Sequence, residues 1–210
     1  TVDPDWSNVI IRHTFDTNIN DISQYEVSQT GNSSATIQTT NVKYGAGALR
    51  MDNVVGYIEH YSYDSNFDPS GTFTAEFWIN WDSITTGNGV GYVMNTIWSQ
   101  TNTANNNDYA FGLFYSNNNV NYLGLTSTNG YRFFWRNDST INYLHSDPIP
   151  SAIVVGNYNH VALVRDANGD MRVYFNGYKL RYNATDTTVF SDTQITNDPG
   201  ADFRIGSPQR

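Results

Sequence analysis

The chain has 210 residues, no cysteine and a formal net charge of -9, from 11 basic and 20 acidic residues. This acidic excess repels phosphate backbones at long range, which excludes nucleic acid and anionic membranes as main partners. The lack of cysteine excludes disulfides, thiol nucleophiles and thiolate metal sites. No run of about 18 apolar residues is present, so no membrane insertion is predicted.

The first half of the chain predicts an N-terminal arm followed by short strands. Residues 1–8 are polar and contain proline, which is typical of an arm or linker, and residues 9–210 are expected to form a single domain. Strands are expected at residues 9–15, 25–28, 35–38, 48–52, 56–60 and 73–82. The last of these has the clearest period-two alternation. Phe77 and Ile79 should face the core, whereas Glu76 and Trp78 should face a groove or a partner layer.

The second half continues the strand pattern, and no amphipathic helix or internal repeat is evident. Further strands are expected at residues 92–99, 109–115, 121–126, 131–136, 187–190 and 203–205, whereas most of residues 137–157 is expected to be loop. Strands at this spacing, separated by turn residues, indicate an antiparallel sandwich or barrel.

Residues 158–180 predict a three-strand meander, because Asn168-Gly169 and Asn176-Gly177 separate apolar runs. Asn-Gly is the preferred pair in two-residue type I′ hairpin loops. If the first loop has two residues, four pairs lie opposite each other, namely Val164 and Val173, Ala162 and Phe175, Leu163 and Tyr174, and Arg165 and Arg172. The last pair brings two like charges together, which suggests that a bulge could shift this register.

The same hairpin, HVALVRDANGDMRVYFNG, resembles the laminin-G-like group of the concanavalin A-like lectin/glucanase superfamily. Residues 44–52, 73–79 and 203–207 resemble further segments of that group, in the same order. The resemblance implies an all-β fold, a two-sheet antiparallel jelly-roll sandwich. Relatives usually continue into a closing C-terminal strand, which this chain is expected to lack. An open C-terminal edge could then pair with another copy or a neighbouring protein.

Sugar binding is the ligand chemistry that the composition favours. An aromatic ring can stack on the apolar face of a pyranose, while polar side chains bind its hydroxyl groups. An aromatic residue in a strand is nevertheless more often part of a core than of a binding platform. The candidate ligand-binding residues are Glu76, Trp78, Trp98, Tyr115, Tyr131, Trp135, Arg136 and Asn137.

The resemblance also implies a structural calcium ion, since relatives often bind one at the rim of the sandwich. By position, its ligands would be Asp16, the carbonyl of Gly45 and Asp202. Such hard oxygen donors suit calcium. The alternative is that these aspartates cap turns.

Catalytic residues are not predicted. Related glucanases carry two glutamates on one strand in a pattern like E-x-D-x-x-E, whereas this chain has only Glu26, Glu59 and Glu76, which are far apart in sequence. The leading hypothesis is therefore a non-catalytic carbohydrate-recognition or adhesion module of a larger extracellular or particle-surface protein. One alternative is a structural or decoration module of a phage virion, in capsid or tail, that contacts protein. A glycoside hydrolase, with Glu76 as a catalytic carboxylate, is the remaining alternative.

Overall fold

The computed structural model describes residues 6–51, 57–60, 71–80, 94–101, 109–116, 130–137, 140–145, 156–179, 190–191 and 202–205. Regular structure in these residues is antiparallel strand, apart from the short 3-10 helix η1 (Trp6–Asn8). Within this part of the chain, no helix is long and apolar enough to cross a membrane. Two compact units are present: residues 1–68, 96–110 and 198–210 form unit 1, and residues 69–95 and 111–197 form unit 2.

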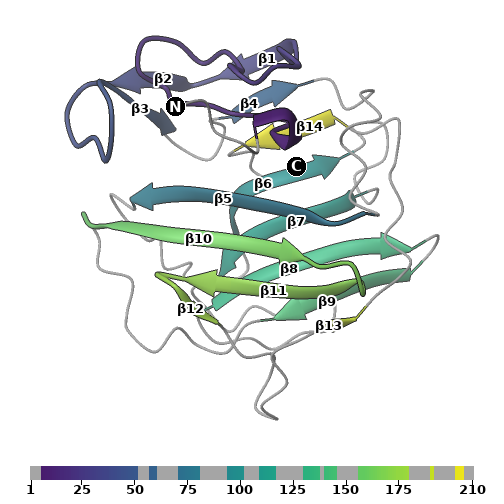
Figure 1. The fold of residues 1–210 in the computed structure, drawn as a ribbon. Coiled ribbons are helices and arrows are strands. Elements are labelled where there is room, and N and C mark those ends of the chain that lie inside the picture. The colour runs from purple at the N-terminus through teal and green to yellow at the C-terminus, as the bar shows by residue number, and fades with distance from the viewer. Residues whose placement is uncertain are drawn as a thin grey trace. The chain divides into compact units, whose positions relative to one another are not determined.

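Unit 1 contains strands from both ends of the sequence (Figure 1). Strand β4 (Tyr57–His60) pairs with β1 (Gln29–Ser33) on one side and with β14 (Asp202–Ile205) on the other. Strand β14 also pairs with β6 (Met94–Thr101), so it has a partner on each side. A separate hairpin joins β2 (Ala35–Gln38) and β3 (Ala48–Met51). The segment after residue 205 lies outside the described residues, and the expected lack of a closing strand stays a prediction.

Unit 2 contains the predicted meander. Strand β10 (Tyr158–Arg165) lies between β5 (Phe73–Asn80) and β11 (Asp170–Phe175), and β12 (Tyr178–Lys179) follows β11 at the edge (Figure 1). Strand β13 (Phe190–Ser191) also pairs with β11. A second antiparallel set consists of β7 (Tyr109–Ser116), β8 (Gly130–Asn137) and β9 (Thr140–His145).

The core of unit 2 lies on one face of the sheet β12-β11-β10-β5. Side chains alternate between the faces of a strand, and directly opposite residues share a face. Val161 and Leu163 on β10 are fully buried, and their partners on β11 are Phe175 and Val173, which are also buried. On β5, the predicted core residues Phe77 and Ile79 belong to this same face and are half-buried.

The loop between β10 and β11 differs from the prediction by one residue. Gly169 has a φ of 82°, and the hydrogen bonds from Asp166 N to Asp170 O and from Gly169 N to Asp166 O, both 3.0 Å, close a loop of residues 167–169. A turn followed by a left-handed glycine is the usual three-residue hairpin loop. The extra loop residue shifts the register, so the predicted pairing is wrong and the structure has Leu163 opposite Val173, Ala162 opposite Tyr174 and Val164 opposite Arg172.

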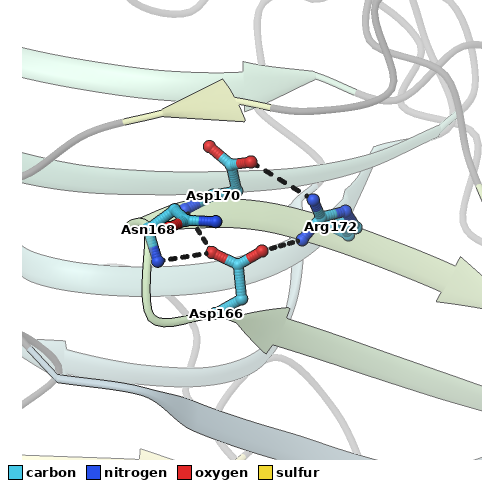
Figure 2. Close-up of polar contacts among 4 residues, drawn as sticks. All are labelled: Asp166, Asn168, Asp170 and Arg172. Carbon is cyan, nitrogen blue, oxygen red and sulfur yellow. Dashed lines mark hydrogen bonds and ion pairs between the residues drawn. The ribbon is translucent and has the colours of Figure 1, made fainter.

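The side chain of Asp166 explains this loop (Figure 2). Its Oδ1 accepts hydrogen bonds from the backbone N–H groups of Asn168, at 2.9 Å, and Asp170, at 3.1 Å. Arg172 donates to Asp166 Oδ2 at 2.7 Å and to Asp170 Oδ2 at 3.2 Å. By contrast, Asn176 and Gly177 have φ values of 48° and 81° and form the predicted two-residue loop before β12.

Most of the other strand predictions are confirmed, some are wrong, and one lies outside the described residues. Strands β2 to β8 and β14 lie close to their predicted positions, whereas β9 was predicted as loop and the predicted strand at residues 121–126 lies outside the described part. No strand forms at residues 9–15 or 25–28. Phe15 and Glu26 there have φ values of 58° and 44°, which interrupt an extended backbone.

Candidate functional site

The outward face of the unit 2 sheet carries an exposed aromatic residue surrounded by polar groups. Trp78 on β5 has 41% of its surface exposed. Its direct partner on the neighbouring strand β10 is His160. Two residues before Trp78 on β5, Glu76 lies opposite Ala162 of β10, and Ala162 lies opposite Tyr174 of β11. We call this surface the Trp78 face and define it by Glu76, Trp78, His160, Ala162, Val164, Arg172 and Tyr174.

Trp78, His160 and Glu76 form the centre of this face. The Trp78 and His160 rings are 5.0 Å apart between centroids and tilted by 45°. His160 Nε2 lies 3.3 Å from Glu76 Oε2, within the distance of an ion pair. The Glu76 side chain is 64% exposed, so this carboxylate also remains accessible to solvent and to a ligand.

Backbone and amide contacts hold His160 in place. Its N–H donates to Asn176 Oδ1 at 2.8 Å, and its carbonyl accepts from Asn176 N, also at 2.8 Å. Asn176 Nδ2 donates to Oδ1 of the buried Asn159 at 3.1 Å, and Asn159 Nδ2 donates to Asn157 O at 3.1 Å. Interlocking hydrogen bonds of this kind restrict rotamers and backbone motion. The start of β10 is therefore a rigid support for the ring of His160.

Arg172 lies at the other end of the face and is already paired with two carboxylates (Figure 2). Its guanidinium donates to both Asp166 and Asp170. The hydrogen bond from Arg172 lowers the pKa of Asp166, with further lowering from the N–H groups of Asn168 and Asp170. The same contact with Asp166 raises the pKa of Arg172. These ion pairs stabilise the hairpin loop, and the loop sets the strand register of the face.

The structure brings two of the predicted ligand-binding residues together, Glu76 and Trp78. The other five members of the face were not predicted as binding residues, because placing them beside Glu76 and Trp78 requires the strand register; they are His160, Ala162, Val164, Arg172 and Tyr174. The remaining candidates lie on described strands, but their side chains are outside what the structure describes. These are Trp98 on β6, Tyr115 on β7, and Tyr131, Trp135, Arg136 and Asn137 on β8.

Two of the three predicted calcium ligands meet at one turn of unit 1. Asp16 Oδ1 accepts a hydrogen bond from Ala46 N at 2.6 Å. Gly45 has a φ of 73°, and a Cβ there would overlap the carboxylate of Asp16. Asp202 is on β14, and its side chain is outside the described part. The described residues contain no group of three or more His, Cys, Asp or Glu side chains that could hold a metal ion. The contact with Ala46 corresponds to turn capping, and calcium stays a prediction.

Comparison with known proteins gives a family and a fold. A model of the concanavalin A-like lectin/glucanases superfamily, of the laminin-G type, matches residues 52–209. No curated protein matches the sequence significantly.

Several solved structures have a similar fold. The binding domain of botulinum neurotoxin serotype D has a TM-score of 0.57 at 11% identity, over 90% of this chain and 40% of that one. The binding domain of Paraclostridial Mosquitocidal Protein 1 has a TM-score of 0.53 at 11% identity, over 95% and 48%. A serotype D ligand-binding domain in complex with N-acetylneuraminic acid has a TM-score of 0.55 at 13% identity, over 93% and 44%.

The chain thus spans less than half the length of these three structures. At such low identity, the likeness shows a shared fold. It agrees with the antiparallel strands of both units and with the predicted jelly-roll sandwich. Because the family model matches well over half of the sequence, the chain belongs to the concanavalin A-like lectin/glucanase superfamily.

Proposed function

We propose that this chain is a non-catalytic carbohydrate-recognition module, and that the Trp78 face is its sugar-binding surface. The observation that carries the proposal is the exposed indole of Trp78 directly beside the Glu76 and His160 pair. An indole offers an apolar surface for the C–H face of a sugar, and a carboxylate accepts hydrogen bonds from its hydroxyl groups. The fold supports the proposal, since one structurally similar domain was solved in complex with N-acetylneuraminic acid.

The surroundings of Glu76 argue against hydrolysis. Glycosidases that use two carboxylates place them about 5 to 9.5 Å apart. Among the carboxylates of the described sheet, Asp166 lies four residues beyond Ala162, the partner of Glu76, which corresponds to about 13 Å along the strand. Glu76 is instead paired with His160. We therefore propose that Glu76 binds a ligand and does not act as a nucleophile or an acid.

A glycan array with the wild-type chain and Trp78→Ala tests the proposal. We expect wild-type binding to at least one glycan class and a loss of tenfold or more in Trp78→Ala, equivalent to about 1.4 kcal/mol. Tyr178→Ala is the matched control, because Tyr178 is 76% exposed and lies opposite Phe175, on the other face of the sheet. Binding should be unchanged in this control.

Two results would overturn the proposal. Wild-type protein that binds no glycan but forms a defined oligomer would favour a structural or decoration module, as in a phage particle. Hydrolysis of a β-glucan that disappears in Glu76→Gln would instead show an enzyme. The expected location of the protein, outside the cell or on the surface of a virion, stays a prediction.

A further inference from the structure

We propose that the Trp78 face selects neutral sugars and disfavours glycans that carry a carboxylate or sulfate next to the stacked ring. This inference rests on the proposed function and names its ligand class. It makes Glu76 the specificity-determining residue of the site.

The charge next to Trp78 is negative and accessible. Glu76 lies two residues from Trp78 on the same face of β5, and its side chain is 64% exposed. One carboxylate oxygen faces His160 at 3.3 Å. The other oxygen has no partner in the contacts described for this part of the chain. It can accept a hydrogen bond from a sugar hydroxyl, whereas an anionic group at the same place would meet a like charge.

The positive side chains of the described sheet do not offset this charge. Arg172 is held by two carboxylates. Arg165 points to the core face, where it is buried and donates to Gly71 O at 2.9 Å. Lys179 is in the same row as Glu76 but three strands away, at about 14 Å. Exposed charges at that distance are largely screened at physiological ionic strength.

His160 only partly compensates for Glu76. A neutral imidazole at this distance carries no charge and leaves the negative charge of the carboxylate in place. When protonated, it forms an ion pair with Glu76 and leaves no excess positive charge for an anionic sugar. The chain as a whole also has a net charge of -9, which repels anions at low salt. Both protonation states therefore favour a neutral ligand.

An array of matched glycan pairs tests this selectivity. Each pair consists of a neutral oligosaccharide and the same oligosaccharide capped with N-acetylneuraminic acid, beginning with lactose and sialyllactose. We expect the wild-type chain to bind neutral members in preference to capped ones, and the preference to shrink as ionic strength rises.

Glu76→Gln keeps the shape and one acceptor oxygen but removes the charge. Repulsion between two like unit charges about 4 Å apart in water weakens binding by about fivefold. The ratio of capped to neutral binding should therefore rise by roughly fivefold in this variant. Glu26→Gln is the charge-matched control, because Glu26 is exposed in unit 1 and is not part of the face. Its ratio should equal that of wild type.

The outcomes separate the selectivity from the function. Preference of the wild type for capped glycans, or an unchanged ratio in Glu76→Gln, would overturn the selectivity while sugar binding stands. Wild-type protein that binds no member of any pair, or Trp78→Ala that binds as wild type does, would overturn the proposed function and this inference with it.

Discussion

Asp21 is a buried carboxylate of unit 1 whose loss should strongly affect the stability of that unit. It is 7% exposed and accepts four hydrogen bonds. Oδ1 accepts from Arg12 N at 2.8 Å and from Ser23 N at 2.9 Å, and Oδ2 accepts from Val27 N at 2.9 Å and from Ser23 Oγ at 2.7 Å. Three stretches of the N-terminal segment, which otherwise lacks strands, are therefore joined through one carboxylate.

Asp21→Ala leaves three backbone N–H groups without their acceptor. The donors of Ser23 and Val27 are buried, and each unsatisfied buried donor costs about 1 to 3 kcal/mol, so the free energy of unfolding should fall by about 2 kcal/mol or more. Asn18→Ala is the matched control, since Asn18 Oδ1 also accepts from the N–H two residues on, at 3.0 Å, but in an exposed loop. The control should lose less than about 1 kcal/mol, because water replaces the lost acceptor.

The two variants are compared by urea unfolding, with intrinsic tryptophan fluorescence and far-ultraviolet circular dichroism as independent probes. A loss of less than about 1 kcal/mol in Asp21→Ala, or equal losses in both variants, would refute the reasoning that the buried carboxylate organises this segment. Coincident transitions from the two probes are required before the free energies are compared.

The pH dependence gives a second readout for Asp21. Burial raises the pKa of its carboxyl, but the hydrogen bonds from Arg12, Ser23 and Val27 lower it more, so the pKa lies below its usual value. A folded-state pKa below the unfolded one contributes stability above the unfolded value, near 3.9, which is lost as the pH falls through the folded value. The difference in stability between wild type and Asp21→Ala should therefore shrink below about pH 4.

Three further predictions concern turns. Gly45→Ala should lower the melting temperature more than Gly177→Ala. Both glycines have positive φ, but a new Cβ overlaps another group, the carboxylate of Asp16, only at Gly45. Equal shifts of the melting temperature in the two variants would contradict this. If calcium binds at Asp16, added calcium should raise the melting temperature relative to excess chelator, and an unchanged temperature would argue against the ion. Deletion of Ala167 leaves Asn168-Gly169 as a two-residue loop between Asp166 and Asp170 and so keeps the native register, and unit 2 should stay folded; a loss of more than about 4 kcal/mol in urea unfolding would contradict this.

The sequence predicts strands well where alternation and turn residues agree. In β5, apolar residues at every second position predicted the inward Phe77 and the outward Glu76 and Trp78, and the structure has that arrangement. The Asn176-Gly177 loop was also predicted, because both residues tolerate positive φ.

The N-terminal segment shows why other predictions were wrong. Residues 9–15 are apolar and β-branched enough to predict a strand, but Arg12 N donates to the side chain of Asp21, which replaces the backbone acceptor that a strand partner would supply. A backbone hydrogen bond from Ile22 N to Arg12 O, at 2.9 Å, also joins the two segments there. A side chain distant in sequence decided the outcome, and local propensity contains no signal for it.

Which side chains form the Trp78 face depends on whether the loop between β10 and β11 has two or three residues. With the two-residue loop that Asn168-Gly169 suggested, Phe175 would lie opposite Ala162 and Val173 opposite Val164, so the outward face beside Glu76 would be apolar. With the three-residue loop, Tyr174 takes the place opposite Ala162, and Phe175 and Val173 go to the core. The hydrogen bonds of Asp166 hold this longer loop. Asp166 therefore positions Tyr174 on the Trp78 face, although its own side chain is occupied by the loop and by Arg172.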